Sequence, residues 1–547
     1  MDEFRYFFSI FGKKLDGTMK TLLLFLSLLG QPGFQEAVLT LTGASCIEEL
    51  AEDEILHYQS LAAHPVDLNH AGRGRLLATG LLSPFQVASL LDYRSRTGEI
   101  LSWTELSLVD GFSPAIADAL RVFAVLRMTE GTAPGQPDDR KLSASLTLRG
   151  GVRDTGETTW GAKGEAALGE RAVLYGSLRT TYENPRPGAP AFSAAWYGRR
   201  ALGQLILGHF NARFGQGLVQ WSGFQLSGYS TLGAFRKNGT GFSPTGSYTP
   251  SLMGVATDWH FGPWDLSVAY SLTGHQPIAN LTRVWRGVTA GLTATAEAAS
   301  LEARIPLPRW SLFAEAALRY RGAFSALAGA YFLPEYGRKA GLLARWYGPS
   351  DKRYSGMAAG YETAMLSLTA DAGWRTDTDA AQYKIAARWH PEAEWRGLRL
   401  LPDLRVQARL RPDDKAPFRA QLRAELGLER GAWSLSGRYD ALFCRDFAWN
   451  WHAELGRKTD AFAVYVRGGL FKVDNWDDRI YVYERDAPGA FTVPARYGRG
   501  WAASCYTLWH INRHHSLWLR LETVQYPWNL TEKPGRTQIR LQYRYRL

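Results

Sequence analysis

The strongest constraint in this sequence is an alternation of apolar and polar residues that recurs from Leu142 to the last residue, Leu547. In the closing run, 539–547, every odd-numbered residue is apolar or aromatic, and three of the four even-numbered residues are arginine. Successive side chains of a β-strand point to opposite faces of the sheet. Each run therefore predicts a strand with one apolar and one polar face.

Both soluble sheet proteins and transmembrane barrels show this alternation of residues, and chain length distinguishes between them. A soluble all-β domain rarely reaches about 400 residues as one piece. The runs are about nine residues long, the span of a tilted transmembrane strand. Aromatic residues cluster near their ends, as in 195–200 and 449–456, which is typical of interfacial girdles. We expect residues 141–547 to form a large antiparallel transmembrane β-barrel of about 18–22 strands, at roughly twenty residues per strand and loop.

The first 45 residues are predicted to be a signal-peptide region. An apolar run at 21–29 follows Lys20 and is too short to span a bilayer, so it is typical of a secretory signal. Met19 would be a natural start, which makes residues 1–18 a possible mis-assigned extension. Export and a barrel together predict the outer membrane as the location and its lipid as a partner.

Residues 46–126 are predicted to form a small all-α domain, followed by a linker at 127–140. Two similar units each contain an apolar helix end, a glycine turn (Gly80, Gly111) and a Ser-Pro pair (Ser83, Ser113) before another apolar helix. Serine as N-cap with proline at the first helical position is a strong helix-start signal. The units repeat at a fixed spacing, which indicates an internal repeat. The fold class is therefore α+β and multidomain.

Charge divides the two parts sharply. Residues 47–126 contain eleven acidic and five basic residues, a net charge of −6, while residues 127–547 carry +17. A lumen of one sign attracts solutes of the opposite charge, so we expect a cationic lumen that favours anions. The sequence leaves open whether acidic residues neutralise these arginines across the lumen. The arginines predicted to line it are Arg405, Arg409, Arg411, Arg419, Arg423, Arg540, Arg544 and Arg546.

The repeated unit at 66–125 resembles tandem helix-hairpin-helix modules. The whole layout is similar to a family of Bacteroidota exported proteins in which a periplasmic helix-hairpin-helix segment precedes an outer-membrane barrel. Two barrel segments, 213–224 (RFGQGLVQWSGF) and 479–500 (RIYVYERDAPGAF…YGRG), are similar to recurring segments of that family. The resemblance implies an architecture more than an activity, and its relation to competence-type receptors implies a possible role in DNA uptake.

Electrostatics argue against DNA binding by this domain. In DNA-binding modules the turn offers backbone N–H groups to a phosphate, whereas here a serine replaces the second glycine of each turn. The domain lacks lysine, and its negative charge would repel a polyanion. The alternatives are a compact plug or a docking domain below the barrel. The candidate contact residues for phosphate or a partner are Gly80, Leu81, Leu82, Ser83, Gly111, Phe112, Ser113, Arg73, Arg75, Arg94 and Arg96.

One long segment, 211–250, is rich in glycine and aromatic residues. Loops of this length are usually functional or disordered, so it predicts either a constriction inside the barrel or an external cap. Its candidate contact residues are Arg213, Gln216, Trp221, Arg236 and Lys237.

Catalysis and metal binding are weakly indicated. The histidines at 510–515 lie in a short turn, the aspartates of 473–478 lack calcium-loop spacing, and three cysteines form no metal cluster. We expect no enzyme activity, metal or cofactor.

The expected function is a channel, transport or docking component for an anionic substrate. The alternatives are a DNA-uptake component and a structural anchor in an envelope assembly with protein partners.

Overall fold

The computed structural model describes residues 33–44, 46–50, 52–128, 142–198, 201–223, 229–248, 250, 252–320, 322–334, 337–349 and 351–547. Residues 1–32 of the predicted signal region and 129–140 of the predicted linker lie outside the described residues. No helix in the described ranges is long and apolar enough to cross a membrane.

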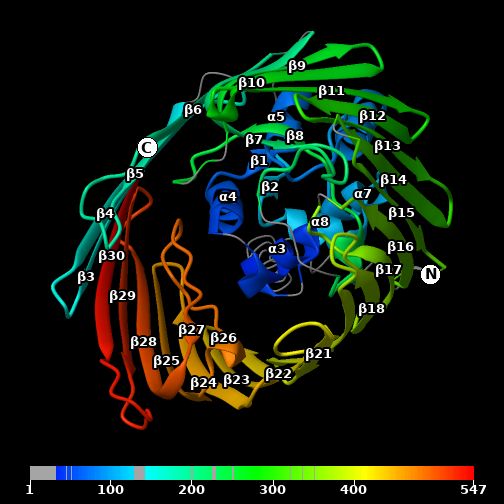
Figure 1. Cartoon of the computed structure of the whole chain (residues 1–547). Coiled ribbons are helices and arrows are strands. Elements are labelled where there is room, and N and C mark those ends of the chain that lie inside the picture. Colours follow the sequence, from blue (N-terminus) through cyan, green and yellow to red (C-terminus); the bar gives the residue numbers. More distant parts are fainter. Residues whose placement is uncertain are drawn as a thin grey trace, which may run out of the picture.

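The described part of the chain starts with a group of helices from Phe34 and continues as one closed sheet (Figure 1). The helices that the structure describes before the sheet are α3 (Phe34–Thr42), α4 (Glu52–Ala63), α5 (Arg73–Ala78), α6 (Pro84–Thr97), α7 (Trp103–Leu108) and α8 (Pro114–Leu120). Within this group the short strands β1 (Val66–Asp67) and β2 (Ala124–Val125) pair in parallel. We call α3 to α8 with these strands the helical domain.

Twenty-four antiparallel strands, all within the described ranges, close into the barrel. They are β3 (Leu142–Arg153), β4 (Thr158–Leu168), β5 (Ala172–Arg179), β6 (Ala191–Tyr197), β7 (Leu202–Arg213), β9 (Leu252–Phe261), β10 (Trp264–Ser271), β11 (Gln276–Trp285), β12 (Val288–Thr295), β13 (Ala298–Pro306), β14 (Trp310–Arg319), β15 (Phe324–Phe332), β16 (Lys339–Tyr347), β17 (Ser355–Glu362), β18 (Leu366–Trp374), β19 (Ala381–Trp389), β21 (Leu398–Leu410), β22 (Phe418–Arg430), β23 (Trp433–Phe443), β24 (Phe447–Lys458), β25 (Phe462–Val473), β28 (Gly498–His510), β29 (His515–Gln525) and β30 (Arg536–Arg546). The last strand pairs with the first, β30 with β3, which closes the sheet.

The predicted fold class, a large antiparallel barrel preceded by a small helical part, is confirmed. The predicted number of strands, 18–22, is too low. Many turns at one end are very short, such as Gly262-Pro263 between β9 and β10 and Arg286-Gly287 between β11 and β12. A strand and its turn therefore take fewer residues than the roughly twenty assumed for membrane barrels.

The alternation in the sequence sorts the two faces of the wall. Leu404, Val406 and Leu422 are exposed on the outside, where a transmembrane barrel meets lipid. Between them, Arg405 and Arg423 point inward, and Arg423 binds a residue of the helical domain. The same parity holds in β30, which ends the chain.

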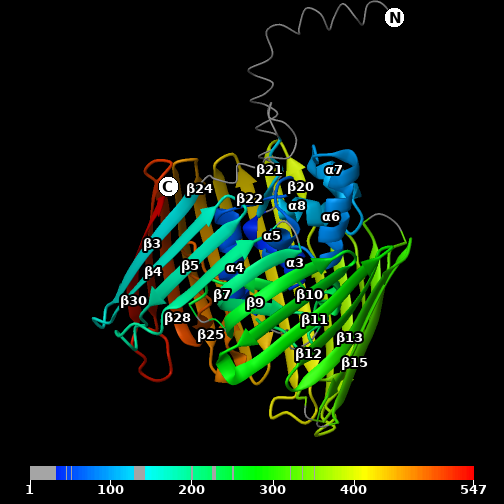
Figure 2. The same cartoon turned by 90° about the horizontal axis from the view of Figure 1, so that it is seen from above.

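The two ends of the barrel differ. The C-terminus lies at the end with the short turns, together with α6 and α7 (Figure 2). Two long segments leave the wall at the opposite end. The first inner loop joins β7 to β9 and contains the short helix η2 (Leu232–Phe235) and strand β8 (Gly241–Pro244). The second inner loop, 474–497, joins β25 to β28 and contains η4 (Trp476–Asp478), β26 (Ile480–Tyr481) and β27 (Ala495–Arg496). One further strand, β20 (Ala393–Trp395), forms a hairpin with β21.

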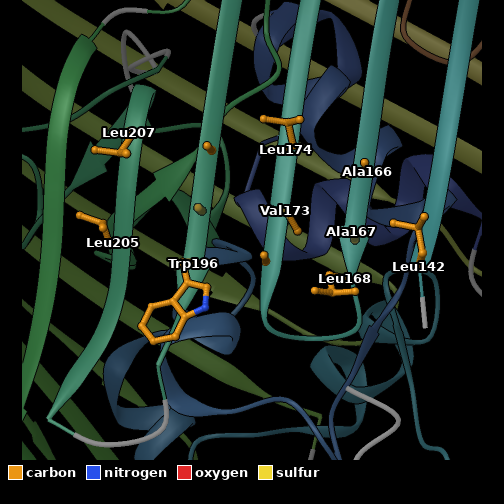
Figure 3. Close-up of a pocket in the computed structure, with 12 residues that line it drawn as sticks. Leu142, Ala166, Ala167, Leu168, Val173, Leu174, Trp196, Leu205 and Leu207 are labelled. Atoms are coloured by element: carbon orange, nitrogen blue, oxygen red, sulfur yellow. The ribbon is translucent and has the colours of Figure 1, made fainter. Parts of the chain in front are cut away.

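A shallow apolar groove of about 330 Å³ runs along the outer wall across β4 to β7. Alanines such as Ala166 and Ala194 line it, and the exposed side chains of Leu168, Leu174 and Trp196 lie along it (Figure 3). Because this face meets lipid, the groove suits hydrocarbon rather than a charged solute. The candidate site for an anionic substrate must therefore be sought in the lumen.

Candidate functional site

The helical domain lies inside the barrel, surrounded by the strands of the wall (Figures 1 and 2). The sequence predicted a plug or a docking domain below the barrel. That position is wrong, because the domain occupies the lumen itself. It has its own apolar core, in which Ile55, Leu90 and Phe123 are buried. Polar side chains on its surface reach the wall, so the domain is both self-contained and tied to the barrel.

The helical domain begins before residue 46. Helix α3 lies within the predicted signal region 1–45, yet Ala37 and Val38 are fully buried in the core of the domain. The ring of Phe34 packs edge-on against Phe123, with centroids 5.9 Å apart. Removing α3 would expose this core, so the segment from Phe34 belongs to the folded domain.

The Ser-Pro pairs start helices as the sequence predicts. Ser83 accepts a hydrogen bond from the backbone N–H of Gln86, and the Gln86 side chain accepts one from the Ser83 N–H, forming a capping box at α6. At α8 the Ser113 side chain accepts a hydrogen bond from the Ile116 N–H, without a reciprocal side-chain bond. These caps fix where the two hairpin turns lie.

Most of the backbone N–H groups of the two hairpin turns for which bonds are seen donate within the protein, as those of Gly80 and Phe112 do to the carbonyls of Leu77 and Val109. Gly80 and Gly111 adopt φ values of 68° and 89°, which favour glycine. In the first turn Leu81 and Leu82 are buried, and the Leu81 N–H donates to Thr79 Oγ1. In the second turn Phe112 is buried, and the Gly111 carbonyl accepts a hydrogen bond from the Gln86 side chain. Both turns therefore pack against protein in this structure.

The four hairpin arginines also have protein partners. Arg73 pairs with Asp265 on β10, and Arg75 pairs with Glu170, in the turn after β4, at 3.1 Å. These two side chains attach the domain to the wall. The other two stay within the domain, since Arg94 donates to the Ala71 carbonyl and Arg96 pairs with Asp92 on the surface.

A carboxylate of the domain meets two arginines of the wall. Glu48, in the short helix η1 (Ile47–Glu49), accepts hydrogen bonds from Arg438 at 2.7 Å and Arg423 at 3.2 Å. Both arginines also bind Asp440 on β23. We call these four residues the Glu48 cluster. Although burial raises the pKa of Glu48, the two guanidinium groups hold it well below its usual range.

The backbone of the second inner loop joins the same cluster. The N–H of Tyr483 donates to Glu48 at 3.1 Å. The carboxylate of Glu48 therefore links the helical domain both to the wall and to a loop from the far end of the barrel. Sequence spacing alone could not find this arrangement.

Acidic residues neutralise much of the arginine-rich wall. Arg405 pairs with Asp403 at 2.6 Å, and Arg540 pairs with Asp486 of the second inner loop. Acidic residues neutralise the charges of Arg409 and Arg419 less completely. These two arginines lie opposite each other in register. The remaining predicted lumen arginines bind Gln382 (Arg411) and Thr147 (Arg544), while Arg546 lies opposite Ser145 on β3.

The first inner loop folds into the lumen, which decides between the predicted constriction and external cap. Its residues Leu218, Leu232 and Phe235 pack against inward-facing residues of the wall such as Phe313 and Tyr331. Thr231 donates a hydrogen bond to the carbonyl of Gly43 in the helical domain. The loop therefore narrows the lumen from the end opposite the helical domain.

The five candidate contact residues of this loop are held by protein groups. Arg213 stacks on Trp221 at 5.7 Å and lies 3.8 Å from Glu54 of α4. Lys237 lies 4.8 Å from the same ring. The Gln216 side chain bonds to the backbone of Lys237, and Arg236 donates to Ser311 on β14.

The second inner loop connects the wall to the helical domain, an arrangement that the sequence did not predict, although this segment was noted there for its resemblance. Its acidic pair, Glu484 and Asp486, binds Arg520 on β29. Its tip, Gly489, accepts a hydrogen bond from Arg149 on β3 and donates one to Gln59 on α4. The sequence feature that could have identified this loop is the pair of acidic residues, Glu484 and Asp486, in an otherwise basic barrel.

The aspartates considered for a cation do not converge. Asp474 pairs with Arg499, Asp477 pairs with Arg445, and Asp478 accepts backbone N–H groups of residues 445 and 446. His510 contacts Ser516 at 2.8 Å across an exposed turn. The His510 turn is therefore exposed as expected, whereas Asp478 is fully buried, so the expectation of a solvated loop is wrong for that aspartate.

Comparison with known proteins gives no family. No family model matches the chain, and no curated protein matches it. Among solved structures, the translocation pore of the P pilus usher PapC has a TM-score of 0.38 at 10% identity, covering 74% of this chain and 99% of that one. OccK3 (OpdO) of Pseudomonas aeruginosa has a TM-score of 0.31 at 12% identity, covering 75% and 97%. OpdK of the same organism, solved with vanillate, has a TM-score of 0.30 at 10% identity, covering 74% and 98%. Similarities this low imply neither a family nor a substrate.

Proposed function

We propose that the protein is an outer-membrane conduit for an anionic substrate, closed by its helical domain and two inner loops. The observation that carries the proposal is the polar attachment of the helical domain: Glu48, Arg73 and Arg75 each bind the wall through ion pairs. The charges of the Glu48 cluster are buried, so breaking the pair from one side is costly, but both partners regain water when the domain leaves, and the net cost of separation is smaller. The apolar packing of the domain on the wall, such as that of Ala78 on α5, is limited in comparison with its own core. A domain attached in this way can leave and return.

The orientation follows from the loops. Outer-membrane barrels have short periplasmic turns and longer extracellular loops. The end with short turns, the C-terminus and α7 is therefore the periplasmic end, and the two inner loops come from outside. On this orientation a periplasmic partner reaches the helical domain, while an external solute reaches the inner loops.

Charge supports an anionic substrate. The segment 47–126 carries −6, and the rest of the chain from 127 carries +17. When the helical domain withdraws, Glu48 leaves Arg423 and Arg438 with only Asp440 between them. The opened lumen is then more cationic than the closed one, and a cationic passage concentrates anions.

Conductance of the full chain in planar bilayers tests the proposal. Glu48→Arg places a third cation against Arg423 and Arg438, so we expect a large rise in the open fraction and a reversal potential that favours anions. The charge-swapped pair Glu48→Arg with Arg438→Glu should return the conductance toward the wild-type level. Asp110→Arg, in the exposed end of the domain, is the matched control and should leave conductance unchanged. Equal conductance in all four proteins would reject the conduit.

A second candidate, docking of an envelope protein, rests on two side chains. Leu101 and Leu108 are 70% and 80% exposed at the end where α6 and α7 reach the mouth of the barrel (Figure 2). Exposed apolar side chains grouped together often mark an interface. If this is the main role, Leu101→Lys with Leu108→Lys should abolish co-purification of a partner after gentle extraction without changing conductance.

DNA uptake would require the helical domain to leave the barrel first. Arg73, Arg75 and both hairpin turns are occupied in the closed structure, which argues against this alternative for the closed state.

A further inference from the structure

A small polar cavity lies where the helical domain, the wall and the second inner loop meet. Gln59, Ser60 and His64 of the α4 region close one side of it. Strands β3, β4 and β30 form the opposite side, and the loop tip at Pro488 and Gly489 covers it. Its free volume of about 20 Å³ is enough for a single water or an ion of similar size.

Three cationic side chains converge on this cavity. Lys163, Thr147 and Arg544 lie in one row across three neighbouring strands, since Thr147 pairs in register with both of the others. Arg149 lies two residues further along β3 and also lines the cavity. Thr147 and Arg544 are at least nine-tenths buried.

Among the described residues, none of the three cations is in direct contact with a carboxylate. Arg544 bonds to Thr147 Oγ1 at 3.1 Å, and Arg149 bonds to the Gly489 carbonyl. No hydrogen bond or ion pair of Lys163 is seen among the described residues, although Glu165 acts on it electrostatically at longer range, and the Nε of Arg149 is buried without a partner there. The one carboxylate in the lining, Glu165, accepts a hydrogen bond from Ser60 at 3.1 Å and lies 3.8 Å from His64.

This arrangement leaves an excess of positive charge in an enclosed space. Like charges held close together in a medium of low dielectric repel strongly, and a buried charge without a counter-charge is costly. Nothing in the lining compensates more than one of the three cations. Burial lowers the pKa of His64, so this side chain contributes little positive charge at neutral pH.

We propose that a compact inorganic anion of about the size of chloride occupies this cavity and joins the helical domain to the wall. The donors are the guanidinium groups of Arg149 and Arg544, the ammonium group of Lys163 and the hydroxyl of Thr147. Helix α4 and the loop tip enclose the anion from the lumen side. The anion binds only when all three elements are in place, so it favours the closed arrangement.

The site does not depend on whether the barrel conducts. A ligand that binds only one arrangement stabilises it by mass action, in proportion to ligand concentration over Kd. The closed arrangement should therefore respond to the kind of anion in the buffer even if no substrate ever passes.

Bromide is a suitable probe because it is close to chloride in size and scatters anomalously. In crystals of the full chain grown with bromide, we expect an anomalous peak between Lys163, Arg149 and Arg544. In Lys163→Met that peak should vanish. Lys384→Met is the matched control, a buried lumen lysine that pairs in register with Asp371, and should keep the peak. A cavity that holds only water in the wild type would overturn the proposal.

Hydrogen exchange in solution gives a second readout that needs no variant. At constant ionic strength, replacing gluconate by bromide at ten times its Kd should slow exchange of the α4 amides about tenfold. In Lys163→Met the two salts should give the same rates. A wild-type protein whose α4 exchange is the same in gluconate and bromide would contradict the site, whatever the conductance measurements show.

Discussion

Arg438 on strand β23 donates a hydrogen bond to Glu48 at 2.7 Å, although 390 positions of sequence separate them. The contact joins the wall of the barrel to the short helix η1 of the helical domain. Asp440 holds the same arginine from the wall side at 2.8 Å. The guanidinium therefore stays charged and oriented when the domain is absent, and it is ready to receive Glu48 again.

Replacing Glu48 by Gln should loosen the helical domain. Removing one partner of a buried ion pair typically costs about 3–5 kcal/mol, and Asp440 reduces that penalty here, so we expect about 3 kcal/mol. Amide exchange in α4, measured by mass spectrometry, should accelerate roughly a hundredfold. Asp110→Asn, an exposed carboxylate of the same domain, should change the rates by less than about twofold. Equal rates for the two variants would show that the Glu48 cluster is not what attaches the domain.

A single methyl group should prevent docking of α5. A Cβ at Gly74 would overlap the carbonyl oxygen of Gly203 in β7, whereas a Cβ at Gly72 meets no atom within 4 Å. Gly74→Ala must therefore push the domain away from the wall, at a cost of about 1–3 kcal/mol or more. Gly72→Ala should cost less than about 1 kcal/mol. Limited proteolysis of the folded barrel compares them, and equal protection of both variants would contradict the close contact.

Acid should weaken the helical domain through His57. Burial, with a smaller effect of Arg213, lowers the pKa of His57 to about 4, and its Nε2 lies 2.7 Å from the Thr79 carbonyl. The unfolded chain takes up this proton near pH 6.5 and the folded domain does not. Stability should therefore be highest above pH 6.5 and fall by about 3 kcal/mol on the way to pH 4.

The pH window separates His57 from Glu48. The pKa of Glu48 is lowered, so its contribution is present above pH 4.5 and is lost only below that value. Exchange of α4 amides is measured from pH 8 to 5 and corrected for intrinsic rates. The variant His57→Gln should show a clearly shallower profile, with a remainder from His64, whose pKa burial also lowers. A slope as steep as that of the wild type would assign the effect to another group.

The closed protein should not bind duplex DNA. Arg73 and Arg75 are paired with wall carboxylates, and non-specific binding needs several free cations facing phosphates. Fluorescence anisotropy of the full chain with a labelled duplex should show no binding at physiological salt. Affinity that falls steeply with added salt, and that is lost when Arg73 and Arg75 become Glu, would restore the DNA-uptake alternative.

Local signals in the sequence are sufficient to predict the individual strands and the starts of the helices. The two-residue period of β21, with Leu404 and Val406 outside and Arg405 inside, follows from the geometry of any strand. The Ser-Pro pairs at Ser83 and Ser113 marked the starts of α6 and α8, because a cap is formed by residues three positions apart. Interactions between residues this close in the chain can be predicted directly from the sequence.

The number of strands and the start of the helical domain are harder to predict from the sequence. Strand number depends on how short the turns are, and a two-residue turn such as Arg286-Gly287 leaves little trace between two alternating runs. Helix α3 is apolar enough to be taken for part of a signal region, and only its packing on Phe123 assigns it to the domain.

What the sequence determined alone is a barrel with an apolar outside, an arginine-rich inside and an acidic helical domain before it. What only the tertiary structure decided is that the acidic domain lies within the basic barrel. Contacts such as Glu48 with Arg438, or Arg73 with Asp265, join residues far apart in the chain. Their pairing depends on which surfaces match in shape and charge once every element has folded, and no spacing in the sequence records that match.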